Sequence, residues 1–247
     1  MALGEELAGA TCSTVYTAGD KVLKVPHAGS EERDSAWAAQ AFSRHGGIEI
    51  LKADEATGAL LMPRLGLDLA HADLVEEEKV RVCAELILQL RETKNDRRAL
   101  DLATWFEEPE AGCHPLKLEG WKEATYLLET SPDPVLLHGD LHHHNILKAP
   151  TGWQSIDPKG MSGDPAFEPC AYMRNPIGGI PKGEALVKLT RNRLSLFAKL
   201  LPYAPRRIWG WSFAQTVVCG FGSPDWAGQQ WALVSEALWE VRNEFLH

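Results

Sequence analysis

The first part of the chain alternates apolar and polar residues in the manner of short β-strands, with one helical segment between them. The stretch STVYTAGDKVLKVP (13–26) has two β-rich runs around Ala-Gly-Asp, which is typical of a hairpin turn. The next stretch, SEERDSAWAAQAFSRHGG (30–47), predicts a helix, because Ser30 is a suitable N-cap, acids fill the first turn and two glycines follow. Residues 48–65 predict a second strand pair.

Beyond Pro63 the pattern becomes helical. One apolar stripe recurs at intervals of three and four residues, at Cys83, Leu86, Ile87 and Leu90. A second stripe lies near the C-terminus, at Trp231, Val234, Leu238, Val241 and Phe245. We therefore predict two regions, a β-rich one in residues 1–63 and a mostly helical one in residues 64–247.

Residues 136–160, LLHGDLHHHNILKAPTGWQSIDPKG, lie between the helical stretches and lack a helical period. They combine two aspartates, an asparagine and three consecutive histidines with short apolar runs. Such a composition fits a metal site built on histidines, a nuclease-like acid cluster or a phosphate-handling centre.

A hairpin is expected within this segment. If residues 150–152 form its loop, Ala149 pairs with Trp153, and antiparallel counting places Asn145 opposite Asp157. An amide oxygen and a carboxylate would then meet at one end of the hairpin.

The oxygen-bearing side chains favour the phosphate-handling centre. Asn145 and Asp157 offer oxygen ligands without thiolates, which suits Mg²⁺ completed by waters and substrate phosphates. Asp140 and Asn145 have the D-x-x-x-x-N spacing of a kinase catalytic loop, in which the Asp orients the acceptor hydroxyl and the Asn holds a metal ion. Lys24, on a predicted strand, is the natural partner for the phosphates.

The histidines invite a zinc interpretation, but adjacent residues on a loop or strand, such as 142–144, cannot all converge on one ion. We expect His138 to brace the loop by hydrogen bonds rather than to titrate in the reaction.

The overall charge narrows the class of partner. The chain has 34 acidic residues against 25 Lys and Arg, a formal net charge of −9. Nucleic-acid phosphates are bound by net basic surfaces, so we predict no nucleic-acid partner. A cationic small molecule suits this charge, although the same acidity also serves solubility alone.

Cysteine usage and hydropathy predict a cytoplasmic protein with no membrane partner. The five cysteines are scattered, odd in number and without metal-binding spacing, as expected for reduced thiols. The first ten residues, MALGEELAGA, carry acids where a signal peptide has Lys or Arg, and no apolar run has the length that spans a bilayer. Monomer and dimer both stay open.

The motifs LLHGDLHHHNIL (136–147) and WQSIDPKGMSGDPAFEP (153–169) resemble those of the aminoglycoside phosphotransferases. They are most similar to the streptomycin 6-phosphotransferase and hydroxyurea phosphotransferase branch. The resemblance is specific over residues 136–170, loose from Gly9 to Leu65 and weak in the C-terminal helices.

The resemblance implies an α+β, bilobal protein-kinase-like fold, with a small β-rich N-lobe containing one helix and a larger, mostly helical C-lobe. Residues 1–63 would then bind the nucleotide, and residues 64–247 would carry the catalytic and substrate-binding groups.

Carried over by position, the resemblance also implies the roles of individual residues. Asp140 would be the catalytic base, Asn145 and Asp157 the Mg²⁺ ligands, and Lys24 the lysine that binds the ATP phosphates. Of the acids at the start of the predicted helix, Glu32 is expected to pair with Lys24, with Glu31 and Asp34 as alternatives.

Further nucleotide contacts follow from the same resemblance. The adenine would lie against the connector of residues 62–65, which includes Met62 and Arg64. The phosphate loop GATCSTVY (9–16) lacks G-x-G-x-x-G, so backbone amides near Cys12 and Ser13 are the expected contacts.

Binding of a cationic aminoglycoside would require carboxylates opposite its ammonium or guanidinium groups. The candidates are Asp164, Glu168, Asp225, Glu236 and Glu240. We expect Glu168 and Asp225 to contact the substrate and Asp164 to be structural. One of the tryptophans of the C-terminal region could stack on a cation. These are Trp209, Trp211, Trp226, Trp231 and Trp239.

Three hypotheses follow for the activity. The first is an ATP-dependent enzyme that phosphorylates a hydroxyl group of an aminoglycoside of the streptomycin type. The second keeps the chemistry but changes the acceptor to hydroxyurea or another small metabolite alcohol. The third is a nucleotide-binding pseudokinase with a regulatory role, which the presence of Lys24, Asp140, Asn145 and Asp157 disfavours.

Overall fold

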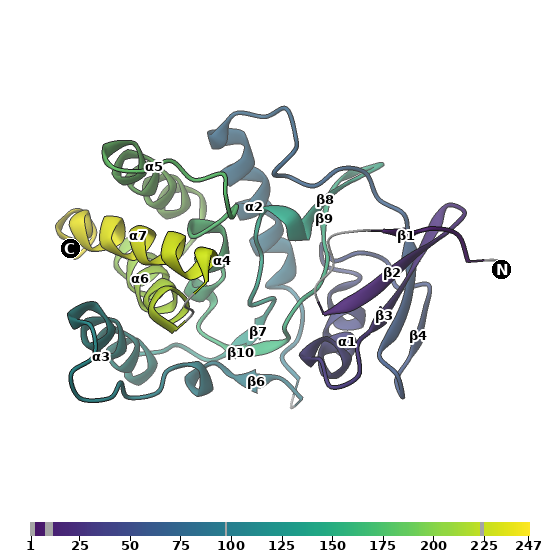
Figure 1. Ribbon diagram of the computed structural model, residues 1–247, viewed down its shortest axis with the longest axis horizontal. Helices are drawn as coiled ribbons and strands as arrows, with labels where there is room; N and C mark the ends of the chain where they lie inside the picture. Colours follow the sequence, from purple (N-terminus) through teal and green to yellow (C-terminus); the bar gives the residue numbers. More distant parts are fainter. Residues whose placement is uncertain (1–2, 8–11, 97, 223–224) are drawn as a thin grey trace.

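The N-terminal region is an antiparallel sheet of five strands in the order β1-β2-β3-β5-β4 (Figure 1). The structure is a computed structural model that describes residues 3–7, 12–96, 98–222 and 225–247. The strands are β1 (Glu6–Leu7), β2 (Ser13–Ala18), β3 (Lys21–Pro26), β4 (Lys52–Asp54) and β5 (Ala59–Pro63). The predicted hairpin turn is confirmed, because Ala18 pairs with Lys21 across Gly19 and Asp20.

One helix, α1 (Glu31–Phe42), packs against this sheet and begins directly after Ser30, as predicted. Its buried side chains point in two directions. Ala36 and Ala39 join Ile48, Leu60 and Met62 in the core of the N-terminal region. Ala38 and Phe42 instead belong to the large core that includes helix α2. This double burial fixes α1 between the two regions.

The C-terminal region is mostly helical, as expected for the larger lobe of a bilobal α+β fold (Figure 1). Its α-helices are α2 (Glu76–Leu90), α3 (Pro115–Glu129), α4 (Cys170–Met173), α5 (Glu184–Leu200), α6 (Pro205–Gly222) and α7 (Trp226–Glu240). Short 3-10 helices are η1 (Leu102–Trp105), η2 (His143–Asn145), η3 (Pro165–Phe167) and η4 (Arg242–Glu244). Helix α6 packs against α3, α4, α5 and α7, so it lies at the centre of this region.

Two small β-structures lie between the sheet and the helices. A three-stranded sheet has the order β6-β10-β7, and a hairpin is formed by β8 and β9. The strands are β6 (Leu100–Asp101), β7 (Val135–Leu137), β8 (Ile146–Ala149), β9 (Gly152–Ser155) and β10 (Met161–Gly163). Together they carry the segment of residues 136–160.

The predicted register of the β8–β9 hairpin is wrong by one residue. Ala149 pairs with Gly152 rather than with Trp153, because Gly152 adopts a φ of 90° and enters the ladder itself. Asn145 is consequently hydrogen-bonded to Ile156, whose amide donates to its carbonyl oxygen at 2.9 Å. Asp157 follows one residue beyond the position that the sequence predicted.

The connector after β5 is bound to this hairpin along its backbone. Gly66 donates its amide to the Lys148 carbonyl oxygen at 2.8 Å, and Lys148 donates to the Leu67 carbonyl oxygen at 2.9 Å. The amide of Leu69 donates to the carbonyl oxygen of Ile146 at 2.8 Å. These bonds hold the hairpin at a fixed position relative to the end of the N-terminal sheet.

Asp164 is structural, as expected, and links the segment after β10 to helix α6. It is 2% exposed, and its side chain accepts the Ala166 amide at 2.9 Å as the N-cap of η3. The same carboxylate accepts the indole NH of Trp211 and the Nε of Arg207, each at 2.7 Å. All three bonds depend on one buried anion.

We expect Asp164→Asn to lower the free energy of unfolding by roughly 3 kcal/mol, because it leaves the Arg207 guanidinium beside an amide in a buried setting. For a chain of this size that loss lowers the Tm by roughly 6–12 °C, as measured by thermal denaturation. Asp133→Asn, at an exposed position, serves as the control. An Asp164→Asn variant as stable as this control would contradict the structural role.

Candidate active site

Lys24 is held between two carboxylates from different parts of the fold. It lies on β3, which is flanked by β2 and β5, and is 6% exposed. Its Nζ lies 2.7 Å from Asp157 Oδ1 and 3.1 Å from Glu32 Oε2. The structure therefore pairs Lys24 with Glu32, the acid that the sequence analysis chose, and adds Asp157 as a second partner.

The two carboxylates keep Lys24 charged. Burial favours the neutral amine, but the negative charges of Asp157 and Glu32 outweigh burial and raise the pKa of Lys24 above its usual value. A charged, partly enclosed ammonium group is suited to binding phosphate oxygens.

Asp157 has a backbone conformation that few non-glycine residues adopt. Its φ is 59°, in the left-handed region, which Asp tolerates better than most residues. This residue follows β9 and Ile156, so the chain turns at Asp157 as its carboxylate meets Lys24. Left-handed backbone at non-glycine residues is common at ligand-binding sites.

Asp140 and Asn145 lie on the loop between β7 and β8. Asn145 Nδ2 donates to the backbone carbonyl oxygen of Asp140 at 2.9 Å, which ties the two ends of the D-x-x-x-x-N motif together. This bond uses the amide nitrogen of Asn145 and leaves its side-chain oxygen as the atom that could face a cation.

The Asp140 carboxylate is flanked by Arg174, which the sequence analysis missed, and by His142, which it considered only as a zinc ligand. Arg174 Nη2 lies 3.4 Å from Asp140 Oδ1, and His142 Nε2 lies 3.8 Å from Oδ2. Burial opposes ionisation of Asp140, yet the charges of His142 and Arg174 hold its pKa below the usual value. Asp140 is therefore a carboxylate at neutral pH.

Arg174 is itself fixed from two sides. Its Nε donates to Gln215 Oε1 at 3.1 Å, and its guanidinium lies 4.8 Å from the centre of the Trp231 ring. Arg174 lies 34 residues after Asp140 and shares no sequence motif with it. The sequence therefore gave no signal that the two side chains meet.

Beneath the loop that holds Asp140 and Asn145 lies a buried pair, His138 and Glu168. The His138 ring donates from Nε2 to the Ile156 carbonyl oxygen at 2.9 Å and accepts the Asp140 amide at Nδ1 at 3.3 Å. The prediction that His138 braces the loop by hydrogen bonds is confirmed. Burial lowers its pKa to about 4, so the ring is neutral at physiological pH.

Glu168 is buried beneath the loop that holds Asp140. Its two oxygens accept the backbone amides of His138 at 2.5 Å and Gly139 at 3.2 Å, and the residue is 5% exposed. The expectation that Glu168 contacts the substrate stays a prediction; in this structure the glutamate supports the backbone of the loop that holds Asp140.

The other acceptor candidates are structural or exposed. Asp225 is exposed and caps α7, where its side chain accepts the Gly228 amide at 2.8 Å. Glu236 and Glu240 are exposed on the same helix. The tryptophans of α6 are core residues, with Trp209 2% and Trp211 0% exposed.

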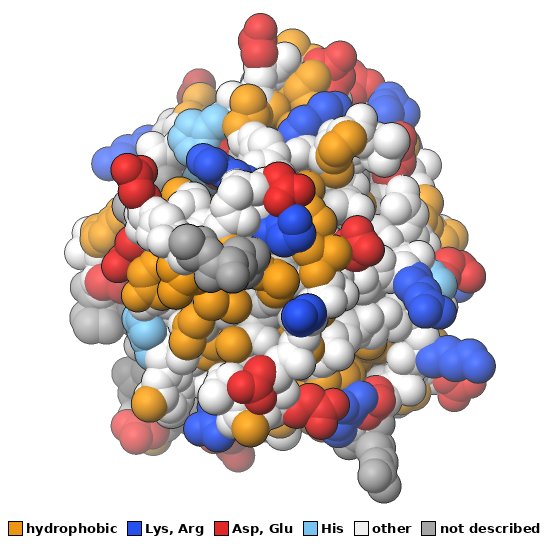
Figure 2. Space-filling model, turned by 90° about the vertical axis from the view of Figure 1, so that its right-hand side faces the viewer, with side chains coloured by type: hydrophobic (Ala, Val, Ile, Leu, Met, Phe, Trp, Pro, Cys, Tyr) orange, Lys and Arg blue, Asp and Glu red, His pale blue; other side chains and the backbone are white. Residues whose placement is uncertain are grey.

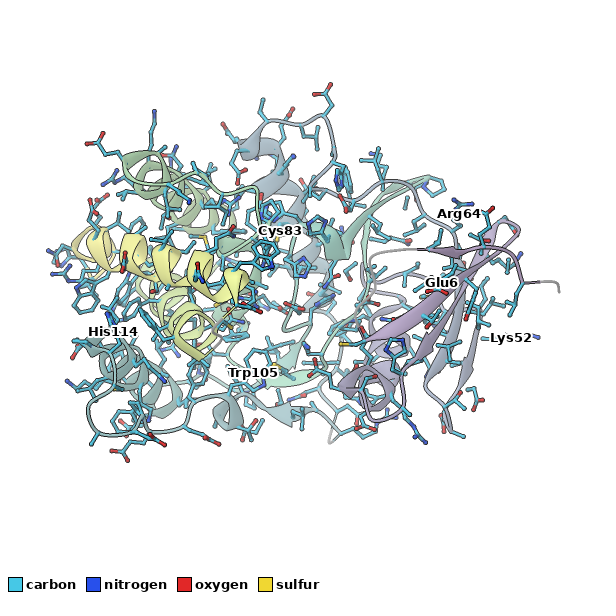
Figure 3. All side chains as sticks on the ribbon, in the orientation of Figure 1. Glu6, Lys52, Arg64, Cys83, Trp105 and His114 are labelled. Atoms are coloured by element: carbon cyan, nitrogen blue, oxygen red, sulfur yellow. The ribbon has the colours of Figure 1, made fainter. Side chains whose placement is uncertain are left out.

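The residues expected at the nucleotide fall into two groups. Met62 is buried in the core of the N-terminal region, whereas Arg64 is exposed at the outer end of the sheet, near the tip of the β2–β3 hairpin (Figure 3). Cys12 and Ser13 lie at the start of β2, and Gly9 and the two residues after it lie outside the described residues. Ser13 Oγ is buried and has no hydrogen-bond partner among the residues that the structure describes.

These side chains fit a Mg²⁺-bound nucleotide. Asp157 and the Asn145 side-chain oxygen are hard ligands of the kind that Mg²⁺ prefers. Lys24 supplies a positive charge, and the orphaned hydroxyl of Ser13 supplies a hydrogen-bonding group at the phosphate loop. Each of these features would be satisfied by phosphate oxygens and a cation.

With this geometry in view, the sequence matches a known class of enzymes. The profile of the aminoglycoside/hydroxyurea antibiotic resistance kinases matches residues 15–225. The chain belongs to this family, and it is thus a kinase of the aminoglycoside phosphotransferase type, which transfers phosphate to hydroxyl groups.

Two curated relatives are similar over much of the chain. Streptomycin 6-kinase of Streptomyces glaucescens is 25% identical over 235 residues, which cover 90% of this chain and 71% of the relative. Streptomycin 3''-kinase of Klebsiella pneumoniae is 30% identical over 173 residues, which cover 65% of each. The chain thus spans slightly less than two thirds of the Klebsiella relative.

Solved structures share the fold at low sequence identity. Choline kinase LicA from Streptococcus pneumoniae aligns with a TM-score of 0.66 and 15% identity, over 97% of this chain and 94% of that one. A thermostable mutant of aminoglycoside phosphotransferase APH(4)-Ia, in ternary complex with ADP and hygromycin B, aligns with a TM-score of 0.58 and 13% identity, over 96% and 94%. The bilobal fold expected from the sequence is confirmed.

No helix among the described residues is long and apolar enough to cross a membrane.

Glu168 makes stability depend on pH in a defined direction. Burial raises its pKa to about 7, against an ordinary value of 4.5. Between these values the folded protein binds more protons at this site than the unfolded chain does, so ionisation of Glu168 lowers stability as the pH rises. At 1.36 kcal/mol per pKa unit the full cost is roughly 3 kcal/mol above pH 7.

We expect Glu168→Gln to remove this dependence, because the amide mimics the protonated acid. The Tm of the variant, relative to the parent, should rise by several degrees as the pH increases from 5 to 7, in thermal denaturation at each pH. Glu129→Gln, at an exposed position, should show a constant difference. The account of Glu168 fails if its Tm difference is also constant across this range.

Proposed function

We propose that the chain transfers the γ-phosphate of Mg·ATP to a hydroxyl group of a cationic small molecule, namely an aminoglycoside of the streptomycin type. In this proposal residues 1–63 form the nucleotide-binding lobe and residues 64–247 the catalytic and substrate-binding lobe. The observation that carries it is the contact of 2.7 Å between Lys24 and Asp157, beside the loop that holds Asp140 and Asn145.

The nucleotide would be held by residues from both lobes. Lys24 would bind phosphate oxygens, with Glu32 fixing the position of its ammonium group. Asn145 and Asp157 would hold Mg²⁺, which neutralises the charge of the phosphates when bound. Backbone amides near Cys12 and Ser13 would contact the phosphates, and the connector at Met62 and Arg64 would contact the adenine.

Asp140 would orient the acceptor hydroxyl and receive its proton. Its lowered pKa makes it a carboxylate, so it can accept a hydrogen bond from the hydroxyl before transfer. Arg174 and His142 hold the carboxylate in place and reduce its basicity. A weak base suits a reaction in which positioning and charge neutralisation supply most of the rate enhancement.

A cationic acceptor is supported by relatives and by charge. Both relatives described above are named as streptomycin kinases, although they are named for different positions on that molecule. The chain has a net charge of −9. On the face formed by the N-terminal sheet, acidic and basic side chains are interspersed (Figure 2). We infer from the negative net charge that nucleic acid is not the partner. The proposal also includes a cytoplasmic location.

A second acceptor is favoured by one observation. Hydroxyurea phosphotransferase of Kitasatospora aureofaciens is 29% identical over 169 residues, and the family profile names hydroxyurea beside the aminoglycosides. Hydroxyurea is uncharged and small, so it would not need the carboxylates that a cationic aminoglycoside does.

The test is transfer of labelled γ-phosphate from Mg·ATP to streptomycin, other aminoglycosides and hydroxyurea, with Asp140→Ala as the catalytic variant. We expect transfer to streptomycin that falls at least about 100-fold in Asp140→Ala, the scale of a lost general base. Asp133→Ala, with an exposed carboxylate removed, should match the parent.

The outcomes test the identity of the acceptor and the role of Asp140 separately. Transfer to hydroxyurea alone would overturn the streptomycin-type acceptor, and so would silence across the panel with Mg·ATP still bound. Equal transfer by Asp140→Ala and the parent would overturn the role of Asp140.

A further inference from the structure

Asp68, His71 and His144 form a cluster outside the proposed catalytic residues. Asp68 Oδ1 lies 2.7 Å from His71 Nδ1, and Asp68 Oδ2 lies 2.8 Å from His144 Nδ1. Within the described parts of the chain, this is the group of three His, Cys, Asp or Glu side chains whose ligand atoms all lie within 4.8 Å of one another.

Backbone contacts bring these side chains together from segments that are 76 residues apart in the sequence. Asp68 forms an antiparallel bridge with Leu147 at the edge of the β8–β9 hairpin. The Leu69 amide donates to the His143 carbonyl oxygen at 3.1 Å, next to His144. The His71 amide donates to Asp68 Oδ1 at 3.0 Å. The backbone on both sides of the cluster is thus fixed before any ligand binds.

We propose that this cluster is a binding site for a divalent transition metal ion of the zinc type. Two imidazole nitrogens and one carboxylate oxygen are a common protein ligand set for Zn²⁺. Mg²⁺ prefers oxygen ligands, so it is a poor competitor at this site. Three protein ligands leave the fourth tetrahedral position to water.

The distances fit an ion that replaces the protons in the hydrogen bonds of Asp68 with His71 and His144. With metal–ligand bonds of 2.0–2.1 Å, two ligand atoms of a tetrahedral site lie about 3.3 Å apart. Asp68 would bind the ion through one oxygen, so the contact of that oxygen with its histidine would open by roughly half an ångström, and the other histidine would turn from the second oxygen to the ion. Side-chain exposures of 73% for His71, 42% for His144 and 16% for Asp68 allow both this adjustment and entry from solvent.

The two histidines that precede His144 make other contacts. His142 accepts the His144 amide at Nδ1, and its Nε2 lies 3.8 Å from Asp140. His143 is 1% exposed, and its ring stacks on Tyr172 with centres 3.9 Å apart. Of the three consecutive histidines, His144 alone contributes to the cluster, in agreement with the argument that adjacent histidines cannot share one ion.

The test is titration of the chelator-treated full chain with Zn²⁺, followed by equilibrium dialysis and by the rise in Tm, with Mg²⁺ as the comparison ion. We expect the cluster to bind one Zn²⁺ per chain. Zn²⁺ should raise the Tm, and Mg²⁺ should not. His71→Ala removes a largely exposed side chain and should weaken Zn²⁺ binding at least about tenfold. His247→Ala removes another exposed histidine and should leave the affinity unchanged.

A Co²⁺ spectrum identifies the ligands. Nitrogen and oxygen ligands give weak visible bands, and the expected change is their loss in His71→Ala. The proposal is overturned if His71→Ala binds Zn²⁺ as tightly as the parent, or if the Co²⁺ complex has the intense charge-transfer band of a thiolate. None of these readouts uses ATP or an acceptor, so a failure here is distinct from a failure of the proposed kinase reaction.

Discussion

The arrangement of the proposed active site depends on one buried lysine that must stay charged. Lys24 brings a positive charge to a position that is 6% exposed, and Asp157 and Glu32 compensate it from the loop after β9 and from α1. A buried ion pair stabilises a fold only when its partners are held in good geometry. The sheet, the helix and the loop must therefore be fixed relative to one another. The two cores that bury α1 and the backbone bonds between the connector and β8 meet this requirement.

The loop that holds Asp140 and Asn145 has its own support, which is chemically different from the surroundings of Lys24. Glu168 and His138 lie below the loop, where burial raises the pKa of the acid and lowers that of the imidazole. Both shifts favour the neutral forms, so at neutral pH His138 is uncharged and Glu168 is partly protonated. Arg174 instead places positive charge beside the Asp140 carboxylate and favours its ionised form. The loop thus has one partly exposed anion, Asp140, and a buried layer beneath it that holds its backbone in place.

Local sequence patterns predicted much of the secondary structure. They failed for features that depend on contacts between residues far apart in the sequence. The β2–β3 hairpin and α1 follow from turn residues and a helix start, and the pairing of Lys24 with Glu32 was implied by the resemblance to the aminoglycoside phosphotransferases. The register of β8–β9 was wrong because Gly152 can join the ladder with a positive φ, which composition does not specify. The sequence did not report the burial of Glu168, and Arg174 was missed because packing alone brings it to Asp140.

The most direct test of the account is the affinity for ATP with and without Mg²⁺, measured for the parent, Lys24→Met and Asp157→Asn. The account predicts that Mg²⁺ strengthens binding to the parent, that Asp157→Asn loses at least about tenfold of this gain, and that Lys24→Met binds more weakly with or without the ion. Asn suits the left-handed backbone at position 157, so this variant changes the charge with little strain. Binding that is independent of Mg²⁺ in the parent, or unchanged in both variants, would contradict the proposal that Lys24 binds the phosphates and Asp157 holds Mg²⁺.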